Sequence, residues 1–262
     1  MLKSFIIAFS TYSKIPMPRV TWDEKSMKYS MCWFPAVGFV IGMVLLAGYR
    51  IGLWLRLPSL LWGVAAAAIP IFVTGGIHMD GFMDTVDAKS SYRSPKERLE
   101  ILKDPHSGAF AILYCFLYLI AAVAMFSTLD ATGLFYVAAG YIYSRILSGL
   151  SVVTLKKAKK DGMLSDTAKA SAKSVRWILC GQLLCFIVLI IIVSVFGNQF
   201  LPFGGRFDFQ IRYGIGLILV GLLAFISYRH MAYKWFGGIT GDLAGYFLQM
   251  CELGILIVIT LL

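Results

Sequence analysis

Seven apolar stretches, each close to the roughly 20 residues that a helix needs to cross a bilayer, dominate this 262-residue sequence. Hydrophobic residues make up 59% of the chain and charged residues only 15%, against roughly 25% charged residues in soluble proteins. Backbone polar groups inside a bilayer must be satisfied within the chain, so the pattern predicts an all-α, polytopic membrane bundle of about seven transmembrane helices. The stretches lie near residues 31–54, 59–77, 108–128, 132–153, 177–197, 211–228 and 238–262.

The segment before the first stretch is apolar but short, and it lacks a small-residue cleavage site. Phe5, Phe9 and Tyr12 share one helical face, which predicts an interfacial helix lying on the bilayer. No linker, repeat or soluble domain interrupts the remainder of the sequence. We therefore expect residues 1–262 to form a single membrane domain.

The net charge of +10 is distributed unevenly between the two sides of the predicted bundle. With the N-terminus in the cytoplasm, 19 of the 24 Lys and Arg residues fall in cytoplasmic segments, four arginines fall opposite them, and Arg145 lies within a span. The positive-inside rule then predicts a multi-pass protein of the cell (inner) membrane with a cytoplasmic N-terminus. Two longer loops, near 78–107 and 154–176, would also be cytoplasmic and catalytic. Because topology accounts for the positive charge, no nucleic-acid partner is expected.

Three aspartates follow the second apolar stretch at helical spacing. Asp80, Asp84 and Asp87 stand at i, i+4 and i+7, which places them on one helix face, where like charges repel unless a cation neutralises them. Mg²⁺ usually takes one or two protein carboxylates and completes its shell with waters and substrate phosphates. The run therefore predicts a site for Mg²⁺ and a diphosphate at the membrane edge, with these aspartates as metal ligands.

The residues just before this run allow two interpretations each. His78 fits a proton acceptor and a packed interfacial residue equally well. Gly75 and Gly76 fit either close helix packing in the membrane or a close backbone approach to a phosphate. The sequence leaves these alternatives open.

The first long loop contains a helix-start signal at residues 94–97, with Ser94 as N-cap and Glu97 completing a capping box. A short helix to about Lys103 would return Asp104 to the membrane edge. There Asp104 would be either a further ligand or second-shell group, or simply a turn residue.

Ionisable residues also occur in or beside the apolar stretches, where charge is costly and usually faces a partner inside the bundle. Arg145 would either bind phosphate or neutralise a buried acid, while Asp242 would join the metal shell and Glu252 a proton path. Lys160 ends the basic run KKAKK, which fits a headgroup-facing topology signal or phosphate capture.

Taken together, these features resemble the cobalamin synthase family, whose members are also called adenosylcobinamide-GDP ribazoletransferases. The resemblance covers nearly the whole chain and keeps the order of several separated motifs. Two positions depart from the family pattern: Ala88 stands in place of a glycine, and Pro105-His106 in place of a serine-arginine pair. The matching motifs are FSTYSKIPMP at 9–18, FPAVG at 34–38 with Gly42, TGGIHMDGFMDTVDA at 74–88, RLEILKD at 98–104, Gly108, Arg145, Gly162 and GGITGDLAGYFLQMCE at 237–252.

The resemblance implies a Mg²⁺-dependent transferase acting in the last steps of cobalamin biosynthesis. It would move the adenosylcobinamide phosphate moiety from adenosylcobinamide-GDP to α-ribazole or α-ribazole 5′-phosphate, giving adenosylcobalamin or its 5′-phosphate and GMP. The residues expected to carry this chemistry are Asp80, Asp84 and Asp87 as metal ligands, Asp104 near the metal, His78 as base, and Arg145 and Lys160 on phosphate.

Two other functions fit parts of this pattern. CDP-alcohol phosphotransferases place an Ala-Arg pair and a longer spacer after their Asp-Gly pair, whereas Asp80-Gly81 is followed directly by Asp84 and Asp87. A Mg²⁺ or solute transporter tends to show inverted repeats with its site near the bilayer midplane, but here the acids cluster at one surface. The sequence leaves the choice of acceptor and the subunit number open, with a homo-oligomer among the options.

Overall fold

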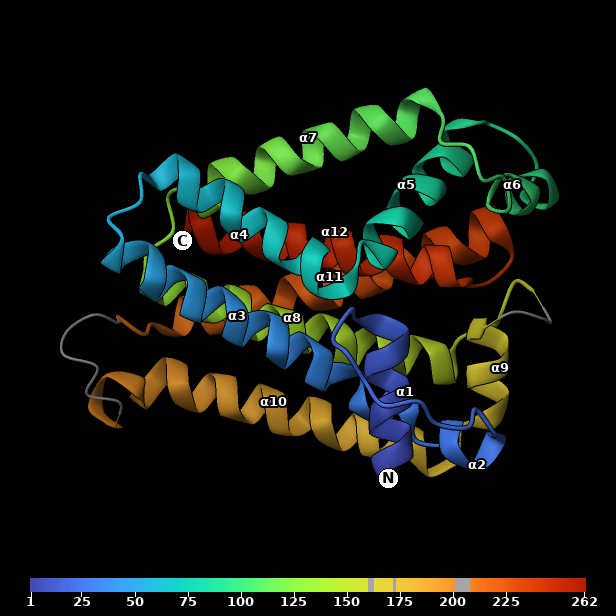
Figure 1. Cartoon of the computed structure of the whole chain (residues 1–262), viewed down its shortest axis with the longest axis horizontal. Coiled ribbons are helices and arrows are strands. Elements are labelled where there is room, and N and C mark those ends of the chain that lie inside the picture. Colours follow the sequence, from blue (N-terminus) through green and yellow to red (C-terminus); the bar gives the residue numbers. More distant parts are fainter. Residues whose placement is uncertain (160–162, 172, 201–207) are drawn as a thin grey trace.

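The computed structural model describes residues 1–159, 163–171, 173–200 and 208–262. Within these ranges the chain forms helices and no β-strand, as predicted for an all-α protein. The longer helices other than α5 (Ile77–Ser90) run roughly side by side along the long axis of the molecule (Figure 1). They are α3 (Phe34–Trp54), α4 (Ser59–Thr74), α7 (Ala109–Phe126), α8 (Ala131–Thr154), α10 (Lys173–Phe200), α11 (Ile211–Phe236) and α12 (Gly241–Leu261).

The number of membrane crossings agrees with the prediction. In the described residues, six helices are long and apolar enough to cross a bilayer alone, and α4 adds a seventh span when counted with α5 (Ile77–Ser90). The helix ends differ most at α11, which continues to Phe236 although its apolar stretch ends near residue 228. Hydropathy marks where the bilayer ends, whereas this helix ends where Gly237 adopts a left-handed φ of 73°.

The short helices gather at one end of the bundle (Figure 1). These are α1 (Leu2–Tyr12), α2 (Glu24–Met27), the 3₁₀ helix η1 (Ser30–Trp33), α6 (Pro95–Ile101) and α9 (Met163–Ala170). Helix α1 runs across the bundle end and not along it, as expected of an interfacial helix, and its Phe5 ring packs against Phe9 and Trp33. Helix α6 begins with the predicted capping box, in which Ser94 and Glu97 satisfy each other's backbone N–H groups.

A sharp bend separates α4 from α5. The two helices meet at 96°, because Gly75 and Gly76 adopt left-handed φ angles of 67° and 80°. A side chain at Gly75 would also displace the Lys14 side chain, since an added Cβ would lie 2.3 Å from its Cε atom. The glycine pair therefore breaks the helix and turns the aspartate-bearing α5 away from the line of α4.

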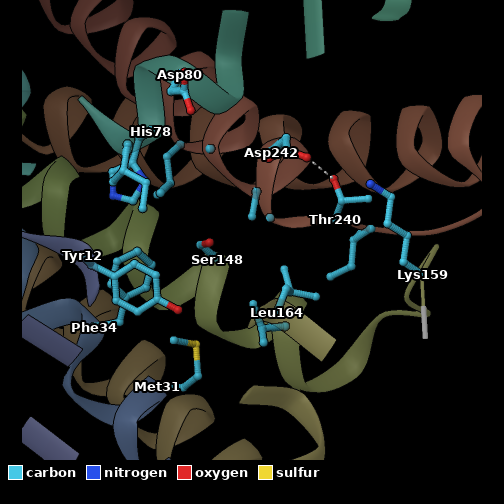
Figure 2. A pocket seen from close by; sticks show the side chains of 17 residues that line it. Tyr12, Met31, Phe34, His78, Asp80, Ser148, Lys159, Leu164, Thr240 and Asp242 are labelled. Carbon is cyan, nitrogen blue, oxygen red and sulfur yellow. Dashed lines mark hydrogen bonds between the residues drawn. The ribbon is translucent and has the colours of Figure 1, made fainter. Parts of the chain in front are cut away.

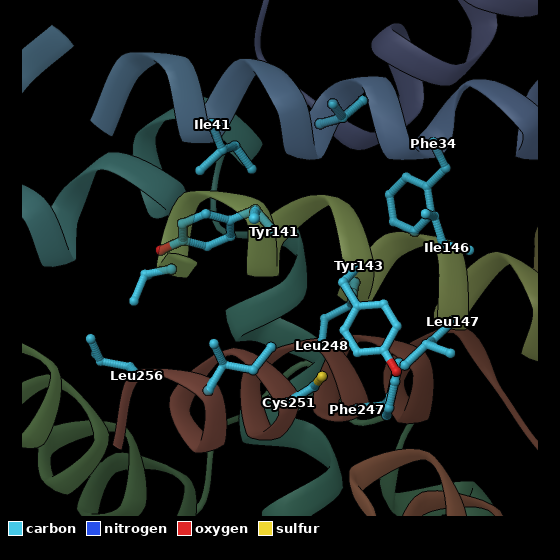
Figure 3. Packing of buried hydrophobic residues seen from close by; sticks show 14 of the residues in the cluster. Phe34, Ile41, Tyr141, Tyr143, Ile146, Leu147, Phe247, Leu248, Cys251 and Leu256 are labelled. Atoms are coloured by element: carbon cyan, nitrogen blue, oxygen red, sulfur yellow. The ribbon is translucent and has the colours of Figure 1, made fainter. Parts of the chain in front are cut away.

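The core forms where α3, α8 and α12 meet (Figure 3). Gly38 lets α3 approach α8 closely, since an added Cβ would lie only 2.2 Å from the carbonyl oxygen of Tyr141. Helix α8 is buried along most of its length, with charged residues nearly absent from its faces. Buried side chains at this junction include Ile41, Tyr141, Tyr143, Ile146, Leu147, Phe247, Leu248, Cys251 and Leu256.

Candidate active site

Two glycines bring the aspartate run of α5 against the start of α12. A Cβ added at Gly81 would lie 2.8 Å from the carbonyl oxygen of Asp242, and one added at Gly245 would lie 3.0 Å from the carbonyl oxygen of His78. Only residues without side chains permit this backbone approach. The contact places Asp80 and Asp242, which are far apart in sequence, beside the same space.

A pocket of about 320 Å³ opens at this contact, at the bundle end that carries the short helices (Figure 2). Its walls differ in character. The aromatic rings of Tyr12 and Phe34 lie on the side of His78, and the polar groups of Thr240 and Lys159 lie on the other side with Asp242. Further lining residues, mostly apolar, are Met31, Ile77, Ser148, Val152, Leu164, Ile239, Ala244 and Leu248.

Backbone pairing fixes the position of Lys159. The N–H of Ile239 donates to the carbonyl of Lys156 at 2.8 Å, and the carbonyl of Ile239 accepts from the N–H of Ala158 at 2.9 Å. Gly238 permits this pairing, because a Cβ there would lie 2.7 Å from the backbone of residues 156–158. The basic run is thus attached to the loop before α12, and its Lys159 lines the pocket.

His78 is packed, as one of the two sequence interpretations expects, and it also borders the pocket; its role as a proton acceptor stays a prediction. The side chain is only 5% exposed and packs against Tyr12 and Phe34, with ring centroids 6.4 and 5.9 Å away. It also lines the pocket, and its buried Nε2 atom has no hydrogen-bond partner among the described residues. Histidine is the residue type that most often acts as a general base, so this side chain is the candidate for that role in the pocket.

The three aspartates of α5 have different surroundings. Asp80 is exposed and lines the pocket. Asp84 is half-buried and experiences the negative charges of Asp80, Asp242 and Asp87. Asp87 caps α7 from a neighbouring helix, because its carboxylate accepts the backbone N–H groups of Gly108 and, at 2.8 Å, Ala111.

The oxygen donors around the pocket suit Mg²⁺ in number and kind. In the described part of the chain, no three His, Cys, Asp or Glu side chains are gathered so as to hold a metal ion alone. Mg²⁺ rarely requires an all-protein cage, since one or two carboxylates, waters and substrate phosphates complete its shell. Asp80 and Asp242, which face one pocket beside Asp84, meet that requirement.

Arg145 and Glu252 form a buried ion pair in the bundle core. Their side chains are 1% and 7% exposed, and Nη1 of Arg145 lies 2.6 Å from Oε1 of Glu252. The same Nη1 donates to the Tyr141 carbonyl at 2.9 Å, and the Ser144 hydroxyl donates to Glu252 at 3.0 Å. Arg145 therefore neutralises a buried acid, which is one of the two roles that the sequence allowed for it. Neither member of the pair lines the pocket, so their roles in phosphate binding and proton transfer stay predictions.

Two predicted residues lie elsewhere. Asp104 is on an exposed turn and accepts hydrogen bonds from the backbone N–H and the Nδ1 atom of His106, at 3.0 and 2.8 Å. These bonds lower the pKa of Asp104, and the residue does not line the pocket. Lys160 lies outside the described residues, directly after Lys159.

Sequence reasoning missed Lys159 and Thr240 as site residues. The sequence carried a signal for Thr240, because a threonine just before an apolar helical stretch is a common N-cap. Its hydroxyl accepts from the N–H of Leu243 at 3.2 Å and lies 3.5 Å from Oδ2 of Asp242. For Lys159 the signal is the basic run KKAKK as a whole, which fits phosphate capture but does not distinguish among its four lysines.

Comparisons with known proteins identify the family of the chain. The family described as Cobalamin-5-phosphate synthase matches residues 4–260. An adenosylcobinamide-GDP ribazoletransferase of Lachnoclostridium phytofermentans is 43% identical over 252 residues, covering 96% of this chain and 91% of the relative. Proteins of the same name from Clostridium botulinum and Treponema denticola are each 31% identical, covering 97% of this chain and 95% and 96% of their own lengths.

No solved structure matches the sequence. The family match, in contrast, extends over almost the entire chain and includes every element that lines the pocket. The chain therefore belongs to the Cobalamin-5-phosphate synthase family.

Proposed function

We propose that this protein is an adenosylcobinamide-GDP ribazoletransferase that acts in the last steps of cobalamin biosynthesis. The observation that carries the proposal is the pocket, which joins an aromatic wall to carboxylates and a lysine at one end of a membrane bundle. A substrate with a large organic portion and a diphosphate needs both surfaces in one site. The names of the relatives give the same activity.

Asp80 and Asp242 would hold Mg²⁺, with Asp84 adding negative charge behind them. The metal, when bound, would neutralise charge on the diphosphate and on the leaving phosphate. Asp87 contributes to this site less directly, because its oxygens already bind the start of α7.

Lys159, which lies on the same side of the pocket as Asp242 and across from His78, would hold the diphosphate there. An ammonium group next to a phosphate forms a strong charge-assisted hydrogen bond. The backbone pairing of Ile239 with residues 156–158 holds the segment just before Lys159 at the pocket. Among the described residues, no carboxylate forms an ion pair with Lys159. Lys160, as its neighbour, remains a prediction for the same role.

His78 is the base in this proposal. A hydroxyl oxygen of α-ribazole, or of its 5′-phosphate, attacks the phosphorus bonded to the cobinamide arm, and the hydroxyl proton passes to the imidazole. The bond from this phosphorus to the bridging oxygen breaks, and GMP leaves with the electron pair. Positioning and electrostatic stabilisation would supply most of the rate, as in other phosphoryl transfers.

The pocket end of the bundle would face the cytoplasm of a bacterial cell, with the protein in the cell (inner) membrane. The basic side chains of the loops at that end support this orientation through the positive-inside rule. We further predict that the protein assembles as a homo-oligomer, a prediction on which the pocket does not bear.

The test is a direct assay of the purified protein in lipid nanodiscs with adenosylcobinamide-GDP, α-ribazole and Mg²⁺. We expect equal amounts of GMP and adenosylcobalamin by mass spectrometry, and loss of both when EDTA removes the metal. Asp80→Asn should abolish the reaction, while the matched control Asp208→Asn, an exposed aspartate before α11, should retain it. Absence of product with both α-ribazole and its 5′-phosphate, in folded protein, would overturn the proposal and direct the assay to CDP-alcohol substrates.

A further inference from the structure

A second hollow region lies on another face of α5 and α12, away from the aspartates. It consists of a pocket of about 470 Å³ between α5, α7, α11 and α12, and an adjoining pocket of about 370 Å³ between α11 and α12. The two pockets share Lys89, Tyr246 and Met250, so they form one groove, here called the α11/α12 groove. None of the residues that line the catalytic pocket lines this groove.

The α11/α12 groove is apolar and opens sideways. Leu117 on α7 is 53% exposed and Met250 on α12 is 41% exposed, although both belong to helices that span the membrane. Side chains exposed at this level face lipid chains and not water. The groove is therefore accessible from the hydrocarbon region of the bilayer.

Lys89 and Trp235 line the groove, and Arg98 lies beside the same Trp235 ring although it does not itself line the groove. Nζ of Lys89 lies 5.1 Å from the ring centroid of Trp235 and 5.8 Å from that of Tyr246, while Cζ of Arg98 lies 4.9 Å from the Trp235 ring. No carboxylate forms an ion pair with either cation in the described part of the chain. Arg98 has a weak bond to the Trp235 carbonyl at 3.4 Å, and its buried Nε atom has no partner there.

We propose that the α11/α12 groove binds an anionic phospholipid, with its phosphate at the cluster of Lys89, Trp235 and Arg98 and its acyl chains along α11 and α12. The arrangement has the three parts that such a ligand needs: unpaired cations, tryptophan and tyrosine rings at the level of the headgroup, and an apolar groove that continues toward the bilayer centre. A soluble phosphate compound would use the cations but leave the apolar part empty. This inference is independent of the proposed transferase activity.

The groove also touches the aspartate-bearing helix. Lys89 is in the last turn of α5, and Phe82 and Val86 of the same helix line the groove. A lipid in this position would support α5 from the side opposite the catalytic pocket. Binding should therefore raise the thermal stability of the folded protein, because a ligand that binds only the folded state stabilises it.

The experiment measures lipid retention by native mass spectrometry, with the protein released from micelles that contain phosphatidylglycerol or phosphatidylcholine. We expect retained phosphatidylglycerol at low stoichiometry and a higher melting temperature than with phosphatidylcholine. Lys89→Gln and Arg98→Gln should each weaken retention by about fivefold, as expected for roughly 1 kcal/mol per basic residue near a lipid phosphate. Lys96→Gln and Arg93→Gln, which alter exposed cations on or before α6, are the matched controls and should retain the lipid.

Two further measurements separate the lipid from other ligands. Leu253→Trp would fill the apolar part of the groove without changing charge, and should reduce retention as the cation variants do. Glycerol phosphate should fail to raise the melting temperature at the concentration at which phosphatidylglycerol does so. Equal retention of both lipids, unchanged retention in the Lys89→Gln variant, or equal stabilisation by glycerol phosphate would each overturn the proposal. If Arg98→Gln fails to fold because Arg98 supports the end of α11, Lys89→Gln alone decides.

Discussion

The backbones of Lys157 and Ile239 pair in a single isolated parallel β-bridge, although the two residues lie 82 positions apart along the chain. One hydrogen bond of 2.8 Å and one of 2.9 Å join Ile239 to the residues on either side of Lys157. The Nζ atom of Lys157 turns back to the end of α8, where it donates to the carbonyls of Val152 and Leu155, and partial burial lowers its pKa. Lys157 thus holds the basic segment to the bundle, and Lys159 is free to face the pocket.

Gly238→Ala should disturb this pairing and displace Lys159. Because an added Cβ would lie 2.7 Å from three backbone atoms of residues 156–158, the two segments must separate. We expect KM for the diphosphate substrate to rise about 10-fold or more, as for the loss of a charge-assisted hydrogen bond. Steady-state kinetics would measure this, and an unchanged KM would remove Lys159 from the site. Gly181→Ala is the matched control, since a Cβ there meets no atom within 4 Å.

Because α5 and α12 approach closely at Gly81 and Gly245, alanine at either position should destabilise the protein, and the two losses of stability should differ in size. Gly81→Ala should destabilise the protein by about 1–3 kcal/mol, because its Cβ would press on the backbone of Asp242. Gly245→Ala should cost less, since its contacts begin at 3.0 Å and not at 2.8 Å. Thermal unfolding in detergent would measure both, and activity should fall in the same order as Asp80 and Asp242 are moved apart. The reverse order would contradict this account of the contact.

Substitution of Asp80 should affect mainly activity, whereas substitution of Asp87 should affect mainly stability. Asp87→Ala removes the cap of α7 and should cost about 0.5–2 kcal/mol of stability. Asp80→Ala should leave the melting temperature almost unchanged and abolish the reaction, because this exposed side chain has no hydrogen bond or ion pair to another described residue. The two variants are compared by calorimetry and by release of GMP. An Asp87 variant that is fully stable but inactive would instead favour its predicted role as a metal ligand.

The buried pair of Arg145 and Glu252 should behave as a unit. Glu252→Gln or Arg145→Met alone should cost about 3–5 kcal/mol, because each leaves an uncompensated buried group. The double variant should be more stable than either single variant, as measured by thermal unfolding. If the double variant folds and turns over normally, Arg145 has only a structural role. A folded but inactive double variant would support the predicted contact of Arg145 with phosphate.

His78→Gln should lower kcat by about 10²–10⁴ with little change in substrate KM, as for loss of a general base. The side chain packs against Tyr12 and Phe34, so Gln preserves much of the volume but offers no basic nitrogen. Melting temperature serves as the control for packing. A variant with native kcat would reduce His78 to an interfacial packing residue.

Much of the fold could be predicted because it depends on local properties. The span predicted at 132–153 corresponds to α8 at Ala131–Thr154, and the capping box before α6 formed as expected, since hydropathy and caps depend on residues a few positions apart. The helical spacing of Asp80, Asp84 and Asp87 also followed from the sequence. The different surroundings of the three aspartates did not follow from the sequence, because Asp87 accepts hydrogen bonds from a helix that begins 22 residues later.

By itself, the sequence determined an all-α membrane bundle, its approximate spans, the aspartate run and the resemblance to one family, because each of these is written in neighbouring residues or ordered motifs. Only the tertiary structure decided which distant groups share a site. It placed Asp242 beside Asp80, attached Lys159 to the loop before α12, and gave Arg145 the partner Glu252. The physical reason is that these contacts depend on how closely two helices approach, which Gly81, Gly245 and Gly238 permit and no periodicity reveals.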